Sequence, residues 1–151
     1  MARFTHPTIS STGDTANSTW VVEGGTTGAG AVSPTFNGAP MFSGGYNKFD
    51  SLCHFHIDVD MDNITNFGSG QYYVKLPFPA KNNYILSDGG LHDISANDEY
   101  QILGHVQAGS DILTLLSIAS NGKHVKFTSS VPVNLSTADN FHIAGMYEVL
   151  N

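Results

Sequence analysis

One ten-residue stretch of this chain alternates strictly between apolar and polar side chains. In SLCHFHIDVD, residues 51–60, Cys, Phe, Ile and Val occupy the odd positions from 53 to 59, and His, His, Asp and Asp occupy the even positions from 54 to 60. Successive side chains of a β-strand point to opposite faces of a sheet. The stretch is therefore predicted to be a strand with one face in a core and a second face that carries two imidazoles and two carboxylates. That second face touches solvent, a metal ion or another subunit.

The composition favours a turn-rich β protein and excludes two classes of partner. Charged residues make up only 13% of the 151 residues, about half of the usual share. The net charge is −7, with only six lysines and arginines. Nucleic acids and anionic membrane surfaces are bound through basic patches, so we expect neither as a partner.

Cys53 is the only cysteine, so a disulfide within the chain is impossible. It belongs to the apolar positions of the alternating strand, and we expect it to be buried as a small hydrophobic residue rather than exposed as a reactive thiolate. No apolar run approaches the roughly 18–20 residues of a membrane span. The first ten residues, MARFTHPTIS, lack the pattern of a secretory signal. The chain is therefore expected to be made and folded in a cytoplasm, with secretion by a route without a signal peptide, or release by lysis, as the alternatives.

Short strand candidates recur from residue 35 onward, separated by turn-forming sequences such as NFGSG, SDGG and SNGK. The apolar run DILTLLSIAS, residues 111–120, is also predicted to be a buried strand, because it is short and ends in a turn signal. Eight or nine strands at this spacing predict an all-β fold, a jelly-roll-like antiparallel β-sandwich. The candidate strands are Thr35–Phe42, Gly45–Phe49, Leu52–Asp60, Gln71–Leu76, Asn83–Ser87, Glu99–Gln107, Ile112–Ala119, Val125–Thr128 and Phe141–Leu150.

The first 33 residues differ in character from the rest. They are rich in Gly, Ser and Thr and contain one short strand candidate, Trp20–Glu23. We therefore divide the chain into an extended N-terminal arm, residues 1–33, and a β-sandwich domain, residues 34–151. Such a segment is either a disordered leader or an arm that becomes ordered across a neighbouring subunit.

Five residues are candidates for a contact with another subunit or with a capsid. Phe4, Ile9 and Trp20 are large apolar residues of the arm without an evident local partner. His54 and His56 lie on the non-core face of the alternating strand, where they could supply polar contacts.

His54 and His56 also allow a metal site. Imidazole and carboxylate ligands suit zinc, iron or manganese. The His-x-His pair followed by Asp60 resembles in part the first motif of cupins, which are jelly-roll metalloproteins, and Gly89-Gly90-Leu91-His92 loosely fits their second motif. The pattern departs from that of cupins because Ser87 stands in place of the usual proline. A cupin-like metalloprotein is thus an alternative to polar residues that face water or a neighbour.

No other pattern of catalysis stands out, and we expect no catalytic residue, metal ion or cofactor. The sequence contains no Gly-x-Ser-x-Gly nucleophile elbow. Glycan binding is a further alternative, although aromatic residues in β-sandwiches also pack across strands. The candidate stacking platforms are Tyr46, Tyr72, Tyr73, Tyr84 and Trp20.

Most of the chain, about residues 34–149, resembles a module of structural proteins from marine and cyanobacterial bacteriophages. The segment PTFNGAPMFSGGYNKFDSLCHFHIDVDMDNITNFGSGQYYVKLPFPA has the PTF, the Gly-rich turn before a tyrosine, the strand ending in DVD and the FGxGQYYVxLPFPA stretch in the same order. LHD at 91–93, GHVQAGS at 104–110 and FHIAGMYE at 141–148 continue the match. The QYYV-LPFP and FHIAG-Y blocks are its most specific parts.

The resemblance implies a trimeric jelly roll without catalytic residues, found as a fibre tip or as a decoration protein on a capsid. We therefore expect a homotrimeric decoration protein that binds the major capsid protein and stabilises a phage head, in virions assembled in the host cytoplasm. Because only about 33 residues precede the expected sandwich, we favour this role over a fibre tip, which usually follows a long shaft. A receptor-binding fibre tip that recognises host surface glycans is the alternative.

Overall fold

The computed structural model describes residues 15–19, 23–38 and 41–150, and this part of the chain consists of strands, turns and loops without a helix. The expected all-β class is therefore confirmed. Phe4, Ile9 and Trp20 lie outside the described residues, so the contacts expected of them stay predictions.

The described residues form thirteen strands, most of which follow the predicted spacing. They are β1 (Thr15–Thr19), β2 (Gly24–Val32), β3 (Thr35–Phe36), β4 (Met41–Phe49), β5 (Leu52–Asp60), β6 (Ile64–Asn66), β7 (Ser69–Lys75), β8 (Tyr84–Leu86), β9 (Asp88–Asp93), β10 (Asp98–Val106), β11 (Ile112–Ile118), β12 (His124–Lys126) and β13 (Asn140–Glu148).

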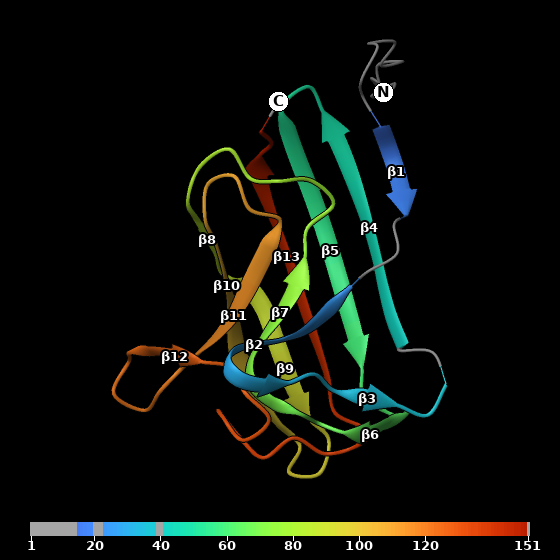
Figure 1. Ribbon diagram of the computed structural model, residues 1–151, viewed down its shortest axis with the longest axis vertical. Helices are drawn as coiled ribbons and strands as arrows, with labels where there is room; N and C mark the ends of the chain where they lie inside the picture. Colours follow the sequence, from blue (N-terminus) through green and yellow to red (C-terminus); the bar gives the residue numbers. More distant parts are fainter. Residues whose placement is uncertain (1–14, 20–22, 39–40, 151) are drawn as a thin grey trace, which may run out of the picture.

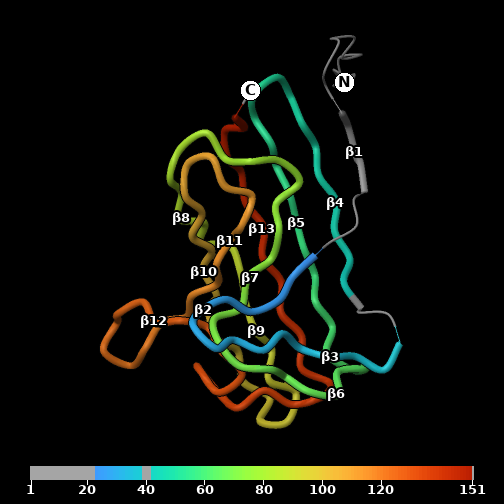
Figure 2. The backbone as a smooth tube through the Cα atoms, viewed as in Figure 1, coloured from blue at the N-terminus to red at the C-terminus, as the bar shows by residue number. Residues whose placement is uncertain are grey.

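Eleven of the thirteen strands form one antiparallel sheet that curls over on itself, and β3 and β6 form a second, two-stranded sheet (Figures 1 and 2). Sheet A has the order β1-β4-β5-β13-β9-β10, and sheet B has the order β8-β10-β11-β7-β2, with β12 beside β11. Strand β10 belongs to both sheets, because residues 98–101 pair with β9 and residues 102–105 pair with β11. The result is an antiparallel β-sandwich in the shape of a half-barrel, as the strand pattern predicted.

Strand β5 confirms the predicted alternation residue by residue. Cys53, Phe55 and Ile57 are fully buried and Val59 is nearly so, whereas the even positions from His54 to Asp58 are exposed. The strand lies between β4 and β13 and pairs with each of them along its whole length. Its apolar face therefore occupies the centre of the core.

Tyr147 of β13 connects this core to the loop that follows β7. Its ring packs edge to face on Phe55, with ring centroids 5.8 Å apart. Its hydroxyl donates a hydrogen bond to the carbonyl of Phe78 at 2.9 Å and accepts one from the amide of the same residue at 3.2 Å. Burial raises the pKa of the Tyr147 hydroxyl, so the group stays a neutral donor. The LPFP loop is thereby fixed on the sheet by a buried side chain.

Two buried carboxylates organise the loops at the opposite end of β13. Asp139 is fully buried and accepts hydrogen bonds from the amides of Ile94 and Ser136 at 3.1 and 2.7 Å, and from the Ser136 hydroxyl at 3.0 Å. Asp93 accepts hydrogen bonds from the Ser95 hydroxyl at 2.7 Å and the Ala96 amide at 3.1 Å. Buried carboxylates need such donors, so these residues hold the turns together rather than form an open site.

The run DILTLLSIAS contains strand β11, so the prediction of a buried strand is confirmed. The stretch Thr35–Phe42 is not one strand, because β3 ends at Phe36 and β4 begins at Met41. Strand β9 was not predicted, since its Gly89-Gly90 pair was taken as a turn.

The expected division of the chain at residue 34 does not coincide with the edge of the sheet. Residues 15–19 pair with β4 and residues 24–32 pair with β7, so both stretches are edge strands of the sheet. The division into an arm and a domain stays a prediction. Glu23, expected to end a short strand, lies outside any strand, and residues 20–22 lie outside the described part.

Replacement of Phe55 by Ala is expected to lower the free energy of unfolding by about 3–5 kcal/mol, because it removes a large buried aromatic ring from the core. Chemical denaturation measures the change. Asp62→Ala is the control, since Asp62 is exposed and surface substitutions usually change stability by less than about 0.5 kcal/mol. Equal losses in the two variants would contradict the assignment of the strand faces.

Acidification is expected to remove the contribution of Asp93 to stability. The hydrogen bonds from Ser95 and Ala96 lower the pKa of Asp93. A carboxyl group whose pKa is lower in the folded chain stabilises it above the unfolded pKa, and the contribution is lost as the pH falls through the folded value. Urea unfolding between about pH 2 and pH 6 should therefore show a smaller acid-induced loss in Asp93→Asn than in the wild type. Identical losses would show that Asp93 is not the group responsible.

Candidate interaction surface

The non-core side of sheet A carries imidazoles and carboxylates from four adjacent strands. The register places His142 of β13 between Asp58 of β5 and Gly90 of β9, and it places His92 of β9 beside Glu99 of β10. Side chains directly opposite on adjacent strands lie about 4.5–5.5 Å apart at Cβ. We call this surface the His–Asp face. Its members are His54, His56, Asp58, Asp88, His92, Glu99 and His142.

Two glycines leave space on the neighbouring strands for the imidazole rings of His56 and His142. Gly45 pairs with His56, and Gly90 pairs with His142. A Cβ atom at position 45 would lie 2.6 Å from Cε1 of His56, and one at position 90 would lie 3.0 Å from Cε1 of His142. Each ring therefore covers the space over a glycine of the neighbouring strand, which keeps the face shallow.

The His–Asp face is acidic at neutral pH. The ion pairs found among the described residues join Lys75 to Glu23 at 2.6 Å and Lys81 to Glu148 at 2.5 Å, and neither pair includes a residue of the face. The register partners of its β5 members on β4 are Ser43, Gly45 and Asn47, none of which is cationic. The carboxylates of the face are therefore open to a partner that carries positive charge.

The face does not bring metal ligands together. His54 and His56 point outward from β5, and His92 is separated from that strand by β13. Within residues 15–19, 23–38 and 41–150, no group of three or more His, Cys, Asp or Glu side chains is placed to hold a metal ion. The three histidines that would form a cupin-like site are thus apart in the structure.

Two open hollows flank His142 on this face. One has a volume of about 300 Å³ and is lined by Ser43, Asp58 and Asn140. The other has a volume of about 390 Å³ and is lined by Gly90, His92 and Gln101. Both are polar and shallow, and they suit a protein surface better than an enclosed small molecule.

Large apolar side chains are exposed beside the His–Asp face. Phe49 and Leu52 are register partners and are each 40% exposed. Met146 is 55% exposed and pairs with His54. An apolar patch next to polar groups is typical of protein interaction surfaces.

Cys53 does not offer a reactive thiolate. It is fully buried, and burial raises the pKa of its thiol above the ordinary value. Its Sγ atom lies 3.9 Å from the carbonyl oxygen of His54. The expectation that Cys53 acts as a small hydrophobic residue is confirmed.

Three of the candidate glycan platforms are packing residues. Tyr46 packs on Phe78 with ring centroids 5.3 Å apart, and the Tyr84 hydroxyl accepts a hydrogen bond from the amide of Glu148 at 3.1 Å. Tyr72 is buried, and this raises the pKa of its hydroxyl to about 12. Tyr73 is half-buried on β7, and Trp20 lies outside the described residues. The aromatic side chains therefore serve mainly the core.

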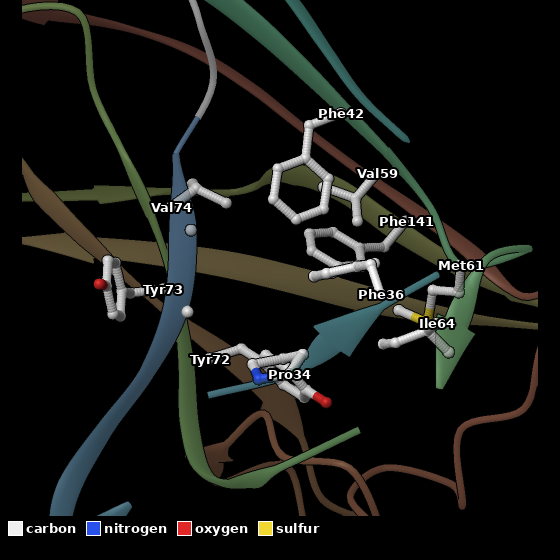
Figure 3. Close-up of a pocket in the computed structure, with 12 residues that line it drawn as sticks. Pro34, Phe36, Phe42, Val59, Met61, Ile64, Tyr72, Tyr73, Val74 and Phe141 are labelled. Carbon is white, nitrogen blue, oxygen red and sulfur yellow. The ribbon is translucent and has the colours of Figure 1, made fainter. Parts of the chain in front are cut away.

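An apolar cavity lies inside the sandwich, between β2, β3 and the end of β5 (Figure 3). Phe36, Phe42, Val59, Met61 and Phe141 contribute to its lining. Its volume is about 30 Å³, whereas ligand pockets measure about 300–1,000 Å³. It is a packing gap with room for no ligand beyond the size of a methyl group or a water molecule.

A hollow of about 940 Å³ lies beside strands β11 and β12. Tyr100, Val125, Val131 and Pro132 give it a largely apolar lining. Ser117 also lines it, and the buried hydroxyl of this residue has no hydrogen-bond partner among the residues that the structure describes. The base of the β11–β12 hairpin is therefore less well covered than the rest of the sandwich.

No protein-family model, curated protein or solved structure matches this chain. Among the described residues, no helix has the length and apolar character needed to cross a membrane.

The alternation of residues 51–60 predicts the correct face for His54 and His56, whereas most of their neighbours on that face were not predicted. The alternation in FHIAGMYE does put His142 on the non-core side of its strand, but nothing in the sequence shows that β13 pairs with β5. Asp88 and His92 were missed as members of the face because β9 was taken as a turn.

Two glycine substitutions test the geometry of the face. In Gly45→Ala the new methyl group meets only the far end of the exposed His56 side chain. We therefore expect the free energy of unfolding to fall by less than about 1 kcal/mol and the imidazole of His56 to move. In Gly89→Ala the methyl group meets the carbonyl oxygens of Ile102 and His142 at 2.8 and 2.9 Å, and overpacking of this kind costs about 1–3 kcal/mol. Thermal unfolding and the imidazole NMR signals measure the two effects. Equal stability losses would contradict the proposed packing.

Proposed function

We propose that this chain is a structural protein of a virion, a homotrimeric decoration protein that binds the major capsid protein and stabilises a phage head. One observation carries the proposal. The outer side of sheet A combines the exposed apolar residues Phe49, Leu52 and Met146 with the polar His–Asp face, and the described part of the chain leaves both uncovered. A symmetric oligomer gains stability by burying such a surface against a neighbouring subunit.

The resemblance to phage structural modules supports the same proposal. Its two most specific blocks, QYYV-LPFP and FHIAG-Y, meet in the fold, because Tyr147 of the second block bonds the backbone of Phe78 in the first. The matching residues therefore include those that build the core of the sandwich. No catalytic role is part of the proposal, since Cys53 is buried and the histidines of the face do not converge.

A trimer is the expected state in solution. Sedimentation equilibrium at micromolar concentration should give three times the chain mass of 16.1 kDa. A mass equal to that of one chain over the whole concentration range would refute the homotrimer.

Cryo-electron microscopy of the particle distinguishes the proposed role from its alternatives. Density for the sandwich at threefold positions on the head is the expected result. Density at the tail would favour a receptor-binding fibre tip. Stoichiometric zinc, iron or manganese in the purified wild type, lost in His54→Ala with His56→Ala, would favour a cupin-like metalloprotein.

A further inference from the structure

The β11–β12 hairpin, residues 116–126, carries the positive charge that the His–Asp face lacks. Lys123, His124 and Lys126 are all exposed. Neither lysine has an acidic partner among the described residues. The other described lysines are engaged: Lys75 and Lys81 form ion pairs, and Lys48 donates to the carbonyl of Asp50. The free lysines of the described chain are thus gathered on this hairpin.

The hairpin projects from the side of the sandwich, as Figures 1 and 2 show. Strand β12 has only three residues and, in the described part of the chain, pairs with β11 alone. An isolated two-stranded hairpin is marginally stable in water. The 940 Å³ hollow beside it leaves its base partly uncovered as well. A second surface that received the hairpin would therefore stabilise it.

The outer side of the hairpin mixes apolar and cationic groups. Leu116 pairs with Lys126, and Ile118, which is 38% exposed, pairs with His124. The His–Asp face mixes apolar and polar groups in the same way, because Met146 lies beside His54 and Ala144 lies beside the carboxylate residue Asp88. The two surfaces are complementary in charge and similar in apolar content.

We propose that the β11–β12 hairpin of one copy of this chain docks on the His–Asp face of the next copy. This inference rests on the proposed homo-oligomer and names the two surfaces that form its contact. The contact is heterologous, since different surfaces of the two copies meet, and repetition of such a contact closes a ring when the rotation between copies permits.

The positions of the charges allow one direct ion pair in this docking. Asp58 and Asp88 lie on either side of β13, opposite His142 and Ala144, so two strand intervals and an offset of two residues separate them by roughly 12 Å. Lys126 shares the outer side of the hairpin with Leu116 and Ile118, whereas Lys123, three residues away in nearly extended chain, lies on the opposite side. Lys126 can therefore meet a carboxylate of the face directly, and Lys123 adds positive charge beside the contact.

Charge reversal on the hairpin tests the proposal. The full chain with Lys123→Glu and Lys126→Glu should associate at least about tenfold more weakly than the wild type, because each contact loses two attractions and gains repulsion. The wild-type association should itself weaken as salt rises from about 0.1 M to 1 M, since screening shortens the range of these interactions. Sedimentation equilibrium measures both effects, and circular dichroism verifies that each variant is folded.

A compensating variant and a matched control sharpen the test. Asp58→Lys with Asp88→Lys should weaken association in the same way, and the chain with all four reversals should recover it. The control carries Gln107→Glu and Ala108→Glu, two exposed positions in the turn between β10 and β11. A further variant, Lys123→Gln with Lys126→Gln, removes the two positive charges and has the same net charge as this control. The control should remain a trimer, whereas the glutamine variant should associate more weakly than the wild type.

The outcomes separate this inference from the proposed function. A wild-type monomer overturns both. A trimer that persists in the hairpin variants, or a four-fold reversal that fails to recover association, overturns the docking alone and leaves the trimer to another surface. A disulfide between the single added cysteines of Lys126→Cys in one copy and Asp88→Cys in another is the independent measurement. It should form in mixtures of the two variants, whereas Gln107→Cys in place of Lys126→Cys should give no such product.

Discussion

The register of β5 between β4 and β13 is the constraint on which the rest of the structure depends. Nine residues of β5 pair on both sides without interruption, so a shift by one residue would turn Phe55 and Ile57 outward and His56 inward. Such a shift would exchange apolar burial for buried imidazoles and carboxylates without partners, which is strongly unfavourable. The same register that fills the core therefore also sets the composition of the His–Asp face.

Sequence patterns predict individual strands well and their neighbours poorly. The alternation in β5 and the apolar run in β11 were sufficient to predict these two strands, because each prediction depends only on the local period of apolar residues and on turn signals. Strand β9 escaped prediction because its Gly89 and Gly90 look like a turn, although close approach to the carbonyl oxygens of Ile102 and His142 requires glycine at position 89 and the ring of His142 lies over Gly90. Strand β2 escaped for a related reason, since GGTTGAGAV has no apolar face and is ordered by pairing with β7.

For the His–Asp face, too, the sequence predicts individual residues but not which strands lie side by side. Its histidines on β5 were found because they are adjacent in the sequence, and their orientation follows from the burial of the intervening residues. His142 and Asp88 join them through pairings between strands that are more than 25 residues apart in sequence, and a single sequence carries no signal for such a pairing. A His-x-His motif therefore defines a face of a sheet, and only the order of the strands tells whether that face gathers metal ligands or presents separate charges.

The acidity of the His–Asp face limits the symmetry of any oligomer that uses it. In an isologous contact, which has twofold symmetry, the same patch meets itself, so Asp58, Asp88 and Glu99 would face a second set of carboxylates. Like charges brought together and desolvated repel each other. A heterologous contact avoids this repulsion, because the carboxylates then meet a different surface of the neighbouring chain. In the described part of this chain the free lysines lie on a projecting hairpin of sheet B, outside the strands of sheet A that form the face. This separation of opposite charges on one subunit favours rings over twofold dimers.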